Sequence, residues 1–286
     1  MKKIKYFVEF LIIIFLLVIF KILGFKLASS LGGLIGRSVG PLFRSKKIIL
    51  SNINKALPKI GEKNTELIVK KMWENYGRIL SEYMFIKNFR NSKYKKFLTI
   101  EGQEILNELK DSKEPVVFIS GHFNNFELMA MQIEKSGINL AAIYRPLNNI
   151  FLNKIMEKIR TKYICRKQIK KGGSGTRELL ESFKNNYSIA IMIDQRVSES
   201  IKVDFFNQKA STTTIPAQLF KKFGSKIVPI YIERINGVYF KMTVSRPITF
   251  EKESTVEEIT LKLNKWLEKM ILINPDQWIW SHDRWK

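Results

Sequence analysis

The sequence predicts an α/β fold in which a mainly parallel central sheet is flanked by helices. From residue 116 onward, short apolar runs alternate with segments of helical periodicity, which is typical of β-α-β connections. The runs occupy residues 116–120, 140–144, 188–193 and 226–232. Residues 238–250 are expected to add antiparallel strands at an edge of the sheet. Residues 61–90 carry apolar side chains at helical spacing, which predicts a helical segment ahead of the sheet.

Chain length and cysteine content favour one main domain in a reducing compartment. With 286 residues, of which 45% are hydrophobic, the chain can bury one substantial core. No internal repeat or long linker interrupts residues 46–286, so they are expected to form this domain. Cys165 is the single cysteine, which excludes an internal disulfide and suits the cytosol. Its default role is that of a small hydrophobic residue rather than a nucleophile.

The first 45 residues are expected to form a membrane anchor and an interfacial helix. Residues 6–25 are nearly all apolar, and this is about the length that a bilayer-spanning helix requires. A signal peptide is the alternative, because three lysines precede the apolar stretch, although no clear small-residue cleavage site follows at once. Residues 27–36 resemble a second, glycine-rich helix lying in or on the bilayer. We expect an uncleaved anchor, spanning or interfacial, with the remainder on the cytoplasmic side.

The charge of the chain indicates acidic partners. The 49 basic residues outnumber the 26 acidic ones, giving a formal net charge of +23. Such a surface suits anionic lipid headgroups, phosphorylated substrates, an acidic carrier protein or nucleic acid. Nucleic acid is not expected as a partner, because the sequence shows neither zinc-ligand spacing nor an RNA-binding aromatic motif.

A histidine and a carboxylate follow the first apolar run at a spacing of five residues. His122 is one of only two histidines in the chain, and Glu127 follows in the sequence Gly-His-Phe-Asn-Asn-Phe-Glu. The two could pair if His122 lies on a turn and a helix begins at Asn124 or Asn125, which places Glu127 in the first helical turn. Glu127 would then orient the imidazole as a general base. A helix capped by Asn124, with no chemistry, is the alternative explanation of this spacing.

Polar residues also follow the later predicted strands. Arg145 closes the second strand and could bind a phosphate or carboxylate, or could be an ordinary surface arginine at a turn. Arg177 follows a glycine-rich stretch that opens a helix and could help to hold an anion, although the stretch is not a Walker A motif. Asp194 and Gln195 end the third strand, where ligand sites of α/β sheets lie, although a strand-end carboxylate can also serve only to cap a turn.

The ordered set of motifs resembles a known enzyme family. Residues 121–127 are similar to the His-x4-Asp/Glu block of the lysophospholipid acyltransferase superfamily, specifically the Gly-His-Phe-Gly-Asn-Trp-Glu form of the lipid A biosynthesis lauroyl/myristoyl acyltransferases. The resemblance covers almost the whole chain. Its further matches, in order, are residues 73–78, Glu82, Tyr83, 144–146, Gly175, Arg177, Asp194, Gln195, Phe205, Phe206, Pro229 and 275–286. Asn124 and Asn207 replace glycines of the family pattern, and Phe126 replaces a tryptophan.

The resemblance implies a glycerolipid acyltransferase-like fold and an inner-membrane enzyme of late lipid A acylation in lipopolysaccharide biosynthesis. Acyl carrier protein, or less often coenzyme A, would donate the acyl group on phosphopantetheine to a hydroxyl of a phosphorylated lipid A precursor. The enzyme would need neither a metal nor a resident cofactor. An enzyme for another glycolipid or phospholipid acceptor, a thioesterase and a non-enzymatic basic membrane-binding protein remain alternatives.

Within this resemblance the site residues take specific roles. His122 and Glu127 are expected to be catalytic. The expected substrate-binding residues are Asn124, Asn125, Arg145, Arg177, Asp194 and Gln195. In the C-terminal segment, Trp278 and Trp280 are expected to pack on the core rather than form an interfacial patch. His282 is not expected to be catalytic, because no acid follows it at a suitable spacing.

Overall fold

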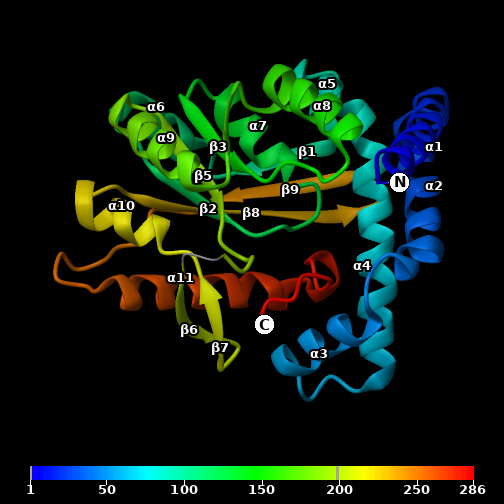
Figure 1. Ribbon diagram of the computed structural model, residues 1–286. Helices are drawn as coiled ribbons and strands as arrows, with labels where there is room; N and C mark the ends of the chain where they lie inside the picture. The colour runs from blue at the N-terminus through cyan, green and yellow to red at the C-terminus, as the bar shows by residue number, and fades with distance from the viewer. Residues whose placement is uncertain (1, 198–199) are drawn as a thin grey trace.

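The computed structural model describes residues 2–197 and 200–286 and confirms the predicted α/β architecture (Figure 1). The strands are β1 (Leu98–Glu101), β2 (Val117–Ser120), β3 (Leu140–Tyr144), β4 (Lys167–Lys170), β5 (Ser188–Met192), β6 (Ile201–Phe205), β7 (Gln208–Thr212), β8 (Ile227–Asn236) and β9 (Tyr239–Val244). The helices are α1 (Lys2–Leu23), α2 (Phe25–Val39), α3 (Lys46–Ala56), α4 (Glu62–Glu82), α5 (Ile86–Arg90), α6 (Gln103–Ser112), α7 (Glu127–Lys135), α8 (Ile150–Ile159), α9 (Gly173–Lys184), α10 (Ile215–Phe223) and α11 (Val256–Ile273).

Seven strands form the central sheet in the order β1-β9-β8-β2-β5-β3-β4. The five strands from β8 to β4 run parallel, so their carboxyl ends meet at one edge. The apolar sequences of β2, β3 and β5 suit burial on both faces, and every residue of β2 is buried. Strand β9 is antiparallel to β8, as expected, but it is not at the edge of the sheet, because β1 pairs with its far side. The four residues of β1 are too few to give a clear periodic signal.

Helices cover both faces of the sheet. Helices α6, α7, α8 and α9 lie on one side of it, while α11 and the β6–β7 hairpin lie on the other (Figure 1). Helix α4 runs past the end of the sheet to which the arrowhead of β8 points. The parallel strands run in the same direction as β8, so their carboxyl ends face the side of the molecule on which α4 lies (Figure 1).

Helices α2 and α4 meet through glycines. A Cβ atom on Gly77 of α4 would overlap the carbonyl oxygen of Gly32, and one on Gly36 would overlap that of Trp73. The backbones can approach this closely only where side chains are absent. The glycines of α2 thus serve close helix packing, while Leu27 and Leu34 of the same helix stay exposed. Whether α2 also touches a bilayer, and whether residues 1–45 act as a separate anchor, stays a prediction.

Helix α1 is the one helix among the described residues that is long and apolar enough to cross a membrane. It has 22 residues with a mean hydropathy of 2.7 over its best 18-residue window, and 6% of that window is buried. Its side chains Phe15 and Ile22 are 66% and 79% exposed. A helix with so much exposed apolar surface is a candidate membrane anchor.

Candidate active site

His122 lies directly after β2 and forms a close pair with Asp194, which follows the neighbouring strand β5. The Nδ1 atom of His122 is 2.8 Å from Oδ1 of Asp194, and the His122 backbone N–H donates to Oδ2 at 2.7 Å. These two residues are 72 positions apart in the sequence, and the pairing of β2 with β5 brings them together. The aspartate therefore holds both the ring and the backbone of His122.

This contact determines which ring nitrogen of His122 can act as a base. An ionised carboxylate only accepts hydrogen bonds, so the nitrogen that faces Asp194 must carry the proton. The other nitrogen, Nε2, then keeps its lone pair and can take a proton from a hydroxyl group. Burial by itself would raise the pKa of Asp194, but the charge and hydrogen bonds of His122 and the indole of Trp278 hold it below its ordinary value.

Trp278 is the third donor to this aspartate. Its Nε1–H donates to Oδ2 of Asp194 at 2.9 Å, and the carboxylate is completely buried. Trp278 is 1% exposed and Trp280 is 0% exposed, which confirms that both tryptophans pack on the core. The buried indole therefore also contributes to the geometry of the site.

Glu127 faces a different partner, which corrects the predicted pairing. His122 lies on the turn after β2 and Glu127 lies in the first turn of α7, as predicted, although the helix begins at Glu127 and not at Asn124 or Asn125. The carboxylate of Glu127, however, accepts from the guanidinium of Arg160, through Nε at 2.8 Å and also through Nη2. Arg160 begins a π-helical turn after α8, and both side chains are largely buried. The carboxylate that orients His122 is therefore Asp194, while Glu127 positions Arg160.

The side-chain amide groups of Asn124 and Asn125 form hydrogen bonds within the protein. The side chain of Asn124 donates to Oε1 of Gln277, and that of Asn125 donates to the buried carboxylate of Glu82 at 3.0 Å. Glu82 also forms an ion pair with Arg234 at 2.6 Å. These contacts hold the His122 turn against α4 and the C-terminal segment. Neither asparagine lines the cavity described below, so their expected contact with substrate stays a prediction.

A cavity of about 500 Å³ opens beside His122. One part of its wall is apolar and includes Ala130, Ala142, Ile143, Ile164, Ala190, Met192 and Ile215. The polar part includes His122, Glu127, Arg145, Arg160, Lys171, Gln195 and His282. Of the substrate-binding residues expected from the sequence, Arg145 and Gln195 thus share this cavity with His122. Arg177 lies on α9 and lines none of the cavities that we describe.

His282 enters the cavity from the C-terminal segment. Its Nε2 accepts the backbone N–H of Arg196 at 3.0 Å, and the side chain of Asn52 holds the carbonyl oxygens of Trp280 and His282. Burial lowers the pKa of His282, and nearby positive charges lower it further. Because Nε2 accepts this hydrogen bond, the ring of His282 supports the segment after β5.

Comparison with known proteins decides the family. The sequence model of bacterial lipid A biosynthesis acyltransferases matches residues 1–286. The chain belongs to this family. It is 24% identical to the lipid A biosynthesis lauroyltransferase of Escherichia coli K12 over 272 residues, covering 92% of this chain and 85% of that protein. It is 22% identical to the lipid A biosynthesis myristoyltransferase of the same strain over 251 residues, covering 86% and 77%. Family membership makes the chain an acyltransferase that takes part in lipid A acylation.

Two departures of this lipid A acyltransferase from the expected motifs have a conformational explanation. Asn124 and Asn207 have φ angles of 45° and 57°, in the left-handed region that favours glycine. Asparagine is among the residues that tolerate this region best after glycine. The asparagines therefore preserve the turns that glycine would form.

Phe126, which replaces a tryptophan, packs edge-on against the His122 ring at a centroid distance of 4.9 Å.

Several site residues were missed or misassigned from the sequence. Asp194 stood out at the end of a strand, but its partnership with His122 depends on the strand order, which no local pattern encodes. Arg160 lies in an irregular turn with no motif of its own. Lys171 follows β4 and lines the cavity, and Arg196 lies shortly after β5. Knowledge that β4 and β5 flank β3 would have pointed to both.

Proposed function

We propose that this acyltransferase moves a fatty acyl group from the phosphopantetheine thioester of acyl carrier protein to a hydroxyl of a phosphorylated lipid A precursor. The observation that carries the proposal is the His122–Asp194 pair at a partly apolar cavity. A histidine held in this tautomer is suited to deprotonate a hydroxyl group. The net charge of +23 suits an acidic carrier, a phosphorylated acceptor and an anionic membrane.

In the proposed reaction, Nε2 of His122 takes the proton of the acceptor hydroxyl while its oxygen attacks the thioester carbonyl. The tetrahedral intermediate carries an oxyanion, and the guanidinium of Arg160, fixed by Glu127, is positioned in the cavity wall to stabilise it. Collapse breaks the carbon–sulfur bond, and the imidazolium returns its proton to the leaving thiolate. Asp194 stabilises the imidazolium between these two steps.

No acyl-enzyme intermediate is part of this proposal. Cys165 is fully buried, and burial raises the pKa of its thiol to about 12, so it is a poor nucleophile. Direct transfer needs only proton movement and a fixed oxyanion, and we therefore propose no metal and no resident cofactor. Coenzyme A carries the same phosphopantetheine arm and is the alternative donor.

The apolar wall of the cavity supports binding of an acyl chain, and helix α1 supports attachment to the inner membrane. Ala142 and Ala190 belong to neighbouring strands of the sheet and leave room beside His122 because of their small side chains. The exposed apolar side chains of α1 would be buried in a bilayer. We propose that α1 anchors the enzyme and that the catalytic domain lies on the cytoplasmic side, where acyl carrier protein is found.

The test is an acyl-transfer assay with purified protein, acyl carrier protein donors of several chain lengths, and either a phosphorylated lipid A precursor or an unrelated glycolipid. We expect mass spectrometry to show one added acyl group on the lipid A precursor, and His122→Ala to abolish it. Transfer to the other glycolipid alone would replace the acceptor in the proposal. Release of free fatty acid without transfer would identify a thioesterase. An unchanged rate in His122→Ala would refute the mechanism.

A further inference from the structure

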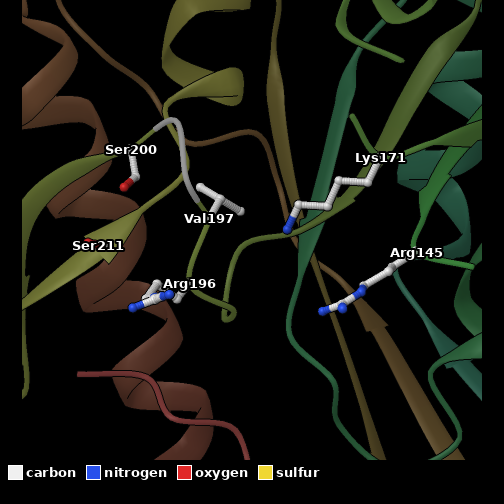
Figure 2. A pocket seen from close by; sticks show the side chains of 6 residues that line it. All are labelled: Arg145, Lys171, Arg196, Val197, Ser200 and Ser211. Atoms are coloured by element: carbon white, nitrogen blue, oxygen red, sulfur yellow. The ribbon is translucent and has the colours of Figure 1, made fainter. Parts of the chain in front are cut away.

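Three basic side chains follow three adjacent strands at the carboxyl edge of the sheet. Arg145 follows β3, Lys171 follows β4 and Arg196 lies shortly after β5. Because β3 lies between β5 and β4 in the sheet, the topology brings the three positions together. Figure 2 shows Lys171 and Arg145 extending toward the side of the pocket that carries Arg196 and Val197.

These side chains line a second cavity of about 490 Å³ beside the catalytic one. Its walls consist of Arg145, Lys171, Arg196, Val197, Ser200 and Ser211, so three cations and two hydroxyl groups surround it (Figure 2). Arg145 and Lys171 also line the cavity that contains His122. The two cavities therefore adjoin, and an anion bound in the second would lie beside the entrance to the first.

Within residues 2–197 and 200–286, no aspartate or glutamate lies within ion-pair distance of these three cations, and Nη1 of Arg196 donates to the backbone oxygen of Lys286 at 3.3 Å. Glu199, three residues after Arg196, lies outside the described residues. The adjacent Lys170, by contrast, pairs with Glu157 at 3.5 Å. All three basic side chains of the cavity are exposed and accessible to a ligand.

The local electrostatics favour an anion at this position. Partial burial lowers the pKa of Lys171, and the positive charge of Arg145 lowers it further. The like charges of Lys171 and Arg145 repel each other, and an anion bound beside them would relieve the repulsion. The backbone around them is fixed, since the Lys171 N–H donates to the Tyr144 carbonyl at 2.9 Å and the Arg196 N–H donates to His282.

We propose that Arg145, Lys171 and Arg196 form a phosphate subsite at the mouth of the catalytic cavity. The proposal rests on the proposed function and adds to it the residues that recognise phosphate. Guanidinium groups bind phosphate oxygens bidentately, an ammonium group supplies a point charge, and the serine hydroxyls add hydrogen bonds. The phosphate belongs either to the acceptor sugar or to the phosphodiester of the donor's phosphopantetheine arm.

The first experiment measures binding without catalysis. Isothermal titration calorimetry with inorganic pyrophosphate compares the full chain in detergent with the triple variant Arg145→Gln, Lys171→Gln and Arg196→Gln. We expect the triple variant to bind at least 10-fold more weakly. Lys184→Gln removes an exposed charge from the end of α9 and should bind like the unmodified protein. Equal binding by the triple variant would overturn the proposal, whether or not acyl transfer is ever observed.

The second experiment identifies the source of the phosphate. Acceptors with and without the sugar phosphate are compared, using either acyl carrier protein or a short acyl thioester of N-acetylcysteamine, which has no phosphate. If the acceptor phosphate binds here, the triple variant raises the acceptor KM roughly 10- to 100-fold only when that phosphate is present, and kcat stays the same. If the donor phosphate binds here, the rise occurs in the donor KM for acyl carrier protein alone. Equal losses of acyl-transfer activity with every combination of donor and acceptor would overturn the proposal. An unchanged melting temperature shows that each variant folds.

Discussion

Two buried carboxylates at the same edge of the sheet have different partners. Asp194 faces the imidazole of His122, whereas Glu127 faces the guanidinium of Arg160. An imidazole can gain and lose a proton near neutral pH, but a guanidinium stays protonated. The first pair is therefore suited to proton transfer, and the second holds a permanent positive charge in place. The chemistry of each carboxylate thus depends on its spatial partner, although Glu127 is the one closer to His122 in the sequence.

The largest expected effect is on catalysis, from Asp194→Asn. The asparagine amide no longer fixes the His122 tautomer or stabilises the imidazolium, so kcat should fall by roughly 10³- to 10⁴-fold. Initial rates at saturating donor and acceptor measure it, and circular dichroism confirms folding. A fall of less than about 10-fold in a folded variant would mean that the His122–Asp194 pair is not the catalytic pair.

The next effect is on stability, from Glu127→Gln. This change leaves the charge of Arg160 largely buried without its partner, and should lower the free energy of unfolding by about 3–5 kcal/mol. Denaturant unfolding in detergent measures it. The exposed Lys226–Glu114 pair is the matched control, and Glu114→Gln should change stability by less than about 0.5 kcal/mol. Combining Glu127→Gln with Arg160→Met should restore part of the loss; no recovery would show that Glu127 acts through other contacts.

A smaller effect is expected from Trp278→Phe. It removes one hydrogen bond to the ionised Asp194 while most of the buried ring remains, so kcat should fall roughly 10- to 100-fold. Trp280→Phe is the control, since its Nε1–H donates to the Pro275 carbonyl at 2.6 Å and not to Asp194. Equal rates for the two variants would show that the indole of Trp278 contributes only packing.

The smallest effect is a dependence of stability on pH. Burial holds the pKa of His282 below 6.5, with further lowering by nearby cations, so the unfolded chain takes up its proton first as the pH falls. This contribution to stability is complete above pH 6.5 and is lost as the pH falls through the folded-state pKa, with a slope of at most about 1.4 kcal/mol per pH unit. Unfolding measured from pH 8 to 5 should be flatter in His282→Gln. Replacing Glu127 and Arg160 together should leave the dependence of the unfolding free energy on pH unchanged. The assignment of this dependence to His282 would be contradicted if the double replacement altered it, or if His282→Gln did not.

Much of the fold was predictable because local patterns encode it. The apolar runs predicted β2, β3, β5 and β8. The location of the site was predicted by the rule that ligands bind at the carboxyl ends of parallel strands. Strand β4 was missed because two of its four residues are lysines. The partner of His122 was mistaken because proximity in sequence is a poor guide to proximity in a sheet, where strand order decides which ends are neighbours.

The C-terminal segment also bears on the order in which the surroundings of Asp194 form. Trp278 and His282 follow every strand of the sheet and the helix α11 in chain order. Chains fold from the N-terminal end as they are synthesised. The sheet that positions His122 and Asp194 therefore precedes, in chain order, the indole that donates to Asp194. The hydrogen bonds from Trp278 to Asp194 and from Asn124 to Gln277 can consequently form only after residues 277 and 278 have been added to the chain.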